Sequence, residues 1–288
     1  MDEILQITEK YDAEYVKDGI TSIEEINRFA TTFYRDVAEI YDCLTRIRNV
    51  KRNPTGFSLD DAPILGLLVR VWKLLKEIIK YYEQNNAEII GILERPLIEA
   101  SVVATHLMTS EGGIIEDYRR CSYKDHLRIL RDLEAGSVFF ESKAGKRLLE
   151  SIREKMEIES LTPQDFGEQK RNRWRVQGKT FYDIFAEVVH ADLYACTYGM
   201  MSGSIHGSWN ETLDWYLIRN DDGSYSPNPF GHPADIRYVS PTIRFTNKPF
   251  RLWLQRIDAY GDDTERLLVW IERLNAALFM KFDEMYDG

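Results

Sequence analysis

Apolar residues recur every three or four positions through most of the first 110 residues of this chain. Ser22-Ile-Glu-Glu25 has the pattern of a capping box, and the periodic segment that it opens runs to about residue 50. The same period continues over about 60–84 and 87–109, and the breakers Asn53-Pro-Thr-Gly56 and Asn85-Asn86 separate the segments. This spacing predicts long amphipathic helices that bury one face against each other. We therefore expect an all-α fold, a multi-helix bundle.

The second half of the chain contains one region of different character. Helical patterns cover about 114–134, 143–159, 180–206 with a break near His190, and 247–288 with an interruption near Gly261. Between them, residues 217–246 contain the turn signal Asp221-Asp-Gly223 and four prolines. Residues 236–239 and 242–246 alternate like short strands. We predict one helical domain over 1–288, with an irregular, partly β excursion at 217–246 and C-terminal helices at 247–288.

Charge and cysteine usage exclude several classes of function. The net charge is −10 and the pI is about 5.2, so no overall positive field draws the chain to nucleic acid or to an anionic membrane. No apolar run approaches the ~20 residues of a membrane span. Three scattered cysteines have no metal-binding spacing, and we expect them to be buried thiols in a reducing cytoplasm. No nucleotide-binding or zinc motif is present, so we expect neither a cofactor nor a metal.

Two rows of polar residues stand out from apolar surroundings. Tyr198, Ser202 and His206 recur at i, i+4 and i+8, so a helix places them in one row. Arg95, Glu99 and His106 form a second row with similar geometry, flanked almost entirely by apolar residues. Buried charges need partners, because an unpaired one costs several kcal/mol. We therefore expect the two rows to face each other inside the bundle.

These rows permit a structural and a functional interpretation. Arg95 and Glu99 could form an i, i+4 salt bridge, and all six residues could form a hydrogen-bonded polar network in the core. Ser202 and His206 at i, i+4 also have the residue types of a nucleophile and its base, but no nucleophile elbow or local acid accompanies them. A polar core network is the stronger of these two interpretations for that pair.

A basic cluster at 170–179 is the local exception to the acidic composition. It contains Trp174, which could stack on an unpaired base or fill a gap in the core, among the cations Lys170, Arg171, Arg173, Arg175 and Lys179. Guanidinium groups next to an indole suit phosphates and bases. The cluster therefore predicts an RNA or nucleotide partner, with Arg173 and Trp174 as candidate contacts.

Several of these motifs occur together in a known family. Arg95-Pro-Leu-Ile-Glu99, Trp174 with Gly178-Lys-Thr-Phe-Tyr182, and Tyr198-x3-Ser202-x3-His206-Gly207 resemble bacterial proteins of the domain of unknown function 5677 family. The resemblance spans roughly residues 60–215 and implies a helical bundle with these polar positions at its centre. The arrangement also resembles, distantly, HEPN helical domains, many of which are metal-independent ribonucleases or nucleotide-linked modules. The HEPN pattern has an arginine at a set spacing before its histidine. This chain departs from the pattern, because Met200, Met201 and Ser202 stand in that region before His206.

Two hypotheses follow for the function. In the first, the protein processes RNA or a nucleotide without a metal. His206 acts as general acid and base, Arg95 stabilises phosphate charge and Glu99 orients one of them, while Tyr198, Ser202 and His106 hold the substrate. In the second, the polar residues are structural, and the protein is a non-catalytic helical module that binds a protein partner or a copy of itself.

Overall fold

The computed structural model describes residues 5–11, 13–162, 165 and 174–286. Almost all of the regular structure is helical, which confirms the predicted all-α fold. The contacts of the chain divide it into two compact units, Met1–Thr109 with Phe185–Gly288, and Ser110–Ile184. No helix in the described ranges is both long enough and apolar enough to cross a membrane.

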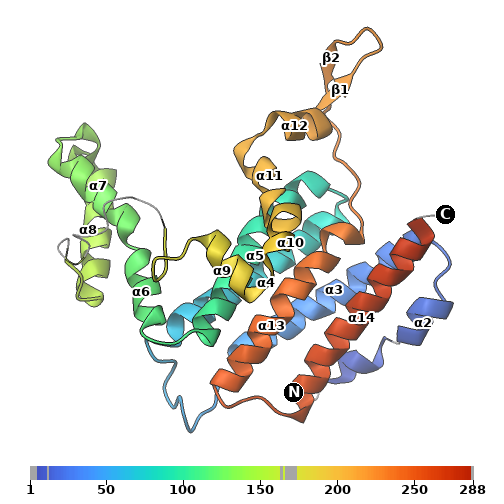
Figure 1. Cartoon of the computed structure of the whole chain (residues 1–288), viewed down its shortest axis with the longest axis horizontal. Coiled ribbons are helices and arrows are strands. Elements are labelled where there is room, and N and C mark those ends of the chain that lie inside the picture. Colours follow the sequence, from blue (N-terminus) through green and yellow to red (C-terminus); the bar gives the residue numbers. More distant parts are fainter. Residues whose placement is uncertain (1–4, 12, 163–164, 166–173, 287–288) are drawn as a thin grey trace. The chain divides into compact units, whose positions relative to one another are not determined.

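Five long helices build the first unit (Figure 1). They are α3 (Ile23–Arg46), α4 (Ala62–Glu83), α5 (Ala87–Thr109), α13 (Ser240–Arg256) and α14 (Asp262–Tyr286). The Ser22 hydroxyl accepts a hydrogen bond from the Glu25 amide, so the predicted cap starts α3. Two short elements, η1 (Gln6–Glu9) and α2 (Ala13–Asp18), precede it. The α5 bounds agree with the segment that the periodicity predicts.

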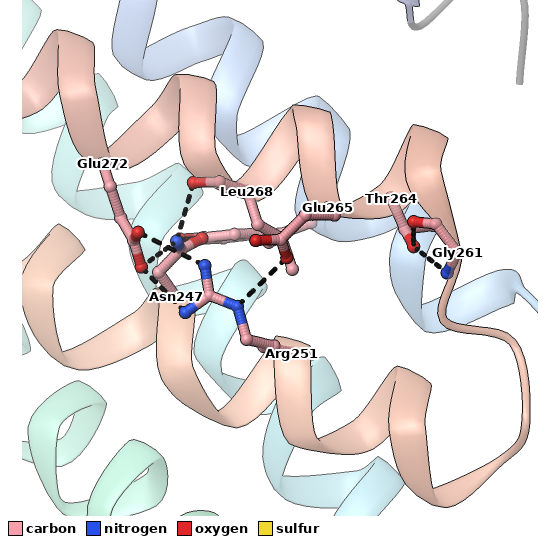
Figure 2. Close-up of polar contacts among 8 residues, drawn as sticks. Asn247, Arg251, Gly261, Thr264, Glu265, Leu268 and Glu272 are labelled. Atoms are coloured by element: carbon pink, nitrogen blue, oxygen red, sulfur yellow. Dashed lines mark hydrogen bonds and ion pairs between the residues drawn. The ribbon is translucent and has the colours of Figure 1, made fainter.

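Helices α13 and α14 are joined by a set of buried and half-buried polar contacts (Figure 2). Asn247 donates from Nδ2 to the Leu268 carbonyl at 2.9 Å and to Glu272 Oε1 at 2.8 Å. Arg251 donates from both terminal nitrogens to the Glu272 carboxylate, at 3.1 and 3.2 Å. Helix α13 also contacts α3, where Phe250 stacks on Tyr41 with ring centres 4.2 Å apart. These contacts hold the C-terminal helices in the bundle.

A series of short elements leads from residue 181 towards the hairpin and α13. It begins with α9 (Phe181–Val188), which starts in the other unit, and continues through α10 (Ala191–Tyr194), the π-helical turn η4 (Ala195–Gly199) and α11 (Ser202–His206). Then come α12 (Trp209–Glu211), capped by the Ser208 hydroxyl, and a second π-helical turn, η5 (Thr212–Tyr216). The predicted break near His190 is present between α9 and α10.

The irregular excursion differs in detail from the prediction. The strands are β1 (Leu217–Arg219) and β2 (Tyr225–Pro227), an antiparallel hairpin around Asp221-Asp222-Gly223, and the hairpin extends beyond α12 (Figure 1). The predicted strands at 236–239 and 242–246 are wrong, because these residues form the 3-10 turn η6 (Ile236–Tyr238) and the start of α13. Pro241 is compatible with a helix because it lies in the first turn, where its missing N–H has no intrahelical partner.

The second unit contains α6 (Ile114–Cys121), α7 (Lys124–Glu134), η2 (Val138–Glu141) and α8 (Lys143–Ile158). One small core, made by Ile152, Met156 and Leu161, packs against half-buried side chains that include Tyr123 and Leu127. The predicted helix at 114–134 is therefore two helices, with the break at Ser122 and Tyr123. Thr162-Pro163 is a helix-start signal and predicts a short helix near 163–171, but that segment falls almost entirely outside the described residues.

Candidate functional site

The two predicted rows of polar residues meet between α5 and η4. The Tyr198 hydroxyl donates a hydrogen bond to Glu99 Oε2 at 3.0 Å. The guanidinium carbon of Arg95 lies 4.5 Å from the centre of the Tyr198 ring, in cation–π geometry. We call these three residues the clasp. Arg95 and Glu99 are one turn apart on α5, so both reach the same ring.

Local backbone geometry brings Tyr198 to this position. The Met200 amide donates to the Ala195 carbonyl at 3.1 Å, an i to i−5 bond that defines the π-helical turn. A Cβ atom on Gly199 would lie 3.2 Å from the Tyr194 carbonyl oxygen, so the absence of a side chain permits the tight turn. Such turns are frequent at functional sites, because the extra residue redirects the side chains around it.

Burial dominates the electrostatics of the clasp. Burial first, and the Glu99 carboxylate after it, together raise the pKa of Tyr198 to about 12, although the Arg95 guanidinium opposes the rise. Tyr198 is therefore protonated at neutral pH and acts as a hydrogen-bond donor to Glu99. Burial also raises the pKa of the neighbouring Glu94 well above its usual range. Sequence reasoning missed Glu94, although it is an acidic residue in an apolar helix.

The predicted catalytic residue His206 lies at the end of α11 and is not one of the three clasp residues. Helix α11 packs on α5 near Gly91, where a Cβ atom would lie 3.3 Å from the Ser204 hydroxyl. Gly91 is two turns before Glu99, which is about 12 Å along the axis. His206 follows Ser204 by two residues and is exposed. In the described structure, His206 forms no hydrogen bond with Arg95, Glu99 or Tyr198.

Ser202 and His106 have partners of their own. The Ser202 hydroxyl donates to the Tyr198 carbonyl at 3.5 Å, a bond to the backbone one turn earlier. His106 is buried near the end of α5, and its Nδ1 lies 3.8 Å from Glu187 Oε2. The geometry therefore unites Arg95, Glu99 and Tyr198 directly, while Ser202 adjoins them through the backbone and His106 contacts a different carboxylate.

The basic cluster belongs to the second unit. Trp174 is half-buried, and Arg175 donates to the Gly178 carbonyl at 3.3 Å. The backbone amide of Arg175 and the Cys121 thiol also approach each other, at 3.3 Å. Arg173, with Lys170 and Arg171, lies outside the described residues. The prediction of an RNA or nucleotide contact at this cluster stays a prediction.

The fold and this site define a helical protein with a polar clasp at the centre of its first unit. The chain belongs to a family of unknown function (DUF5677), whose model matches residues 61–225, more than half of the chain. The match begins just before α4 and ends at the start of β2, so it includes both sides of the clasp. This confirms the family that the sequence motifs suggest. Comparison with curated proteins and with solved structures finds no match.

Proposed function

We propose that this chain is a non-catalytic helical module that associates with a second copy of itself through the β1–β2 hairpin. The clasp supports a structural role for its three residues, because Glu99 and Arg95 both act on Tyr198. A general acid or base must reach the proton that it transfers, within about 3 Å or through one water. His206 is exposed at the end of α11 and forms no hydrogen bond with a clasp residue in the described structure, so the observed contacts do not pair it with Glu99 for that task.

The hairpin carries the proposal of self-association. Its strands have three residues each, and an isolated two-stranded hairpin is at best marginally stable in water. The Asn228 amide donates a hydrogen bond to the Tyr216 carbonyl, and the Asn220 amide donates one to the Ser224 carbonyl. These two bonded pairs lie two residues on either side of the pair Ile218 and Ser226. By the alternation of an antiparallel ladder, the backbone groups of Leu217 and Arg219 then point outward from β1.

The two edges of the hairpin are not equivalent. Pro227 has no N–H group and closes the outer edge of β2, as prolines commonly do at sheet edges. The edge of β1 contains no proline. A second copy can therefore pair its β1 antiparallel to this one, which makes a four-stranded sheet with a β2 strand on each outside edge. Such a contact is isologous, and it closes at a dimer because both new edges carry Pro227.

Exposed apolar side chains occur on the hairpin and in the segments that flank it. Ile218 is 46% exposed, Trp209 is 60% exposed, and the Trp209 ring lies 6.1 Å from that of Tyr225. Further exposed apolar residues in the same stretch of chain are Met200, Ile205, Tyr216 and Phe230. Residues of these types suit an interface, because the cores of interfaces are enriched in aromatic residues and methionine.

Sedimentation velocity over a range of protein concentrations tests the proposal. The wild type should sediment as a dimer whose fraction falls on dilution. Ile218→Lys should weaken dimerisation at least tenfold, since it removes two apolar side chains from the centre of the new sheet and places two cations there. Met280→Lys is the matched control, because it changes an exposed apolar residue of α14, outside the hairpin and its flanking segments, and should leave the dimer intact. A wild type that stays monomeric at high concentration would reject the proposal.

One observation favours metal-independent, HEPN-like processing of RNA or a nucleotide as a second candidate. Arg95 Nη1 is buried and has no hydrogen-bond partner among the described residues. A phosphate oxygen would satisfy it, and the exposed imidazole of His206 lies on the helix that packs against α5. Mixed RNA, incubated without divalent metal with the wild type and with His206→Ala, tests this candidate. Cleavage by the wild type alone would support it, and cleavage by neither would remove it for these substrates.

The cysteines support a reducing cytoplasmic setting for either candidate. All three are free thiols, with Cys43 half-buried, Cys121 buried and Cys196 exposed. The exposure of Cys196 corrects the expectation that all three are buried. Labelling of intact cells with a membrane-impermeant thiol reagent should leave Cys196 unmodified, while lysis should expose it to the reagent.

A further inference from the structure

A recess of about 300 Å³ lies between α5, α13 and the segment from α9 to η4, next to the clasp. Its floor consists of the buried residues Ser101, Val102 and Thr105 of α5. Its walls are half-buried and mainly apolar, and they come from Val188, Val189, Thr197, Pro241 and Phe245. All of these residues belong to the first unit. The recess thus passes from a buried floor, which includes two hydroxyl groups, to an exposed rim.

Two cations stand at that rim. Arg244 and Lys248 are exposed and lie one turn apart on α13. Lys248 Nζ donates to the Val188 carbonyl at 3.2 Å, and the Arg244 guanidinium lies 5.4 Å from the centre of the Phe279 ring. In the described part of the chain, neither has a carboxylate within ion-pair distance. Like charges at i, i+4 destabilise a helix slightly, so an anion between them would relieve a repulsion.

The hydroxyl groups inside the recess cannot donate to a ligand without breaking existing bonds. Ser101 donates to the Leu97 carbonyl and Thr105 to the Ser101 carbonyl, both at 2.9 Å. Thr197 donates to the Leu193 carbonyl at 2.6 Å. These oxygens retain only acceptor capacity, which repels an anionic group. An anion therefore binds at the cationic rim, and the interior suits hydrocarbon.

We infer that this recess binds an amphipathic monoanion, with an aliphatic tail against Val102, Val188 and Val189 and an acidic head between Arg244 and Lys248. Ligand sites are typically concave and mainly apolar, with a few polar groups that fix orientation, and their volumes start near 300 Å³. The protein carries a net charge of −10, so an anion is repelled at long range. Local cations without acidic partners are then required for binding.

A second recess, between α3 and α4, differs from the first because carboxylates balance its cations. Its volume is about 470 Å³, and its charges neutralise each other. Arg35 pairs with Glu83, and Lys80 pairs with Glu77. Because Arg35 and Lys80 already have carboxylate partners, and because Glu39 offsets the charge of Lys76, this larger recess offers an anion little gain. It therefore supplies matched control positions on the same protein.

Calorimetric titration with octanoate, below the concentration at which it forms micelles, tests the inference. Octanoate should bind at one site per chain, while octanol and acetate should bind at least tenfold more weakly because each lacks one half of the recognition. Extending the tail from hexanoate to octanoate should tighten binding by roughly tenfold, as expected for two buried methylene groups. Shifts in the methyl resonances of Val102, Val188 and Val189 should locate the ligand.

Two double variants that each remove two positive charges distinguish a local effect of the rim cations on octanoate affinity from an effect of the net charge of the protein. Arg244→Gln with Lys248→Gln should weaken octanoate binding at least tenfold, whereas Lys76→Gln with Lys80→Gln should change it less than twofold. All four positions are on the surface, and circular dichroism checks that both variants fold. Equal affinity of the two variants, equal binding of octanol and octanoate, or no binding of octanoate by the wild type would each overturn the inference. None of these results depends on whether the hairpin dimerises.

Discussion

Helix α13 carries two rows of polar residues that differ in what they contact. Asn247 and Arg251 face α14 and bond to Glu272, and Asn247 is almost fully buried (Figure 2). Arg244 and Lys248, each three residues earlier, are exposed at the rim of the recess and lack acidic partners within the described residues. The two rows have the same spacing on the same helix. The difference indicates that the first row stabilises the fold and the second is available for a ligand.

The first row should contribute far more to stability than the second. Partly buried, bidentate ion pairs and buried amides with several bonds are costly to interrupt, because their partners stay behind without bonds. Exposed cations with no acidic partner contribute little, and their removal can even reduce repulsion. Substitutions in the two rows therefore test whether the contacts or the residue types decide the role of a position.

The largest effect is expected for Asn247→Leu. Leucine is similar in size but leaves the Leu268 carbonyl, Glu272 Oε1 and the Tyr41 hydroxyl without the bonds that Asn247 provides. We expect a loss of about 3 kcal/mol in the free energy of unfolding. Urea denaturation of both proteins gives the difference. A loss below about 0.5 kcal/mol would show that this row is not structural.

The next largest effect concerns the clasp between α5 and η4. The pKa of Tyr198 is raised to about 12 from 10.0, so the folded state holds this proton more tightly than the unfolded chain does. The resulting stabilisation is complete below pH 10 and is lost as the pH rises from 10 to 12, a change of about 2–3 kcal/mol.

Tyr198→Phe isolates that contribution. At pH 7 the variant should be about 1 kcal/mol less stable than the wild type, because it lacks the bond to Glu99. Between pH 10 and 12 the difference should shrink and change sign, since phenylalanine has no proton to lose. Parallel denaturation curves across this pH range measure it, and the other tyrosines titrate equally in both proteins. A constant difference would mean that Tyr198 ionises like an exposed tyrosine.

A smaller effect is expected for Arg251→Met. Methionine keeps the packing of the aliphatic stem but removes the bonds to Glu272 and the 3.5 Å ion pair with Glu265. Because the arginine is partly exposed, solvent screens the pair, and we expect a loss of about 1 kcal/mol. The loss should decrease in high salt. Thermal melts at low and high ionic strength provide the measurement.

The smallest effect on stability is expected for Arg244→Gln. We expect a change within about 0.5 kcal/mol, of either sign, because no acidic partner is left behind. The same denaturation assay that detects Asn247→Leu provides the scale. A loss comparable to that of Arg251→Met would place Arg244 in the structural row through its contact with Phe279.

The helical framework and the clasp were predictable from the sequence, and the recess was not. Buried charges on α5 must find partners, so a second polar row at 198–206 was the natural candidate, and Tyr198 does reach Glu99. The row prediction fails at His206, because the π-turn and the break after Gly199 shift the residues that follow out of a single α-helical row.

The recess was missed for two identifiable reasons. Residues 242–246 alternate like a strand, so Arg244 and Lys248 were not placed on one helical face. On α5, the sequence signal for the recess is the pair Ser101 and Thr105, which lie one turn apart in an otherwise apolar helix. A hydroxyl row of this kind bonds to its own backbone, so it carries no partner information by itself.

The π-turn at η4 links the two sites through consecutive residues. Thr197 lines the recess, and Tyr198 binds Glu99. A turn with one residue fewer would be α-helical and would rotate everything after it by about 100°. Deletion of a single residue in this turn would thus separate Tyr198 from Glu99 and reshape the recess in one step. A substitution, by contrast, changes either the clasp or the recess.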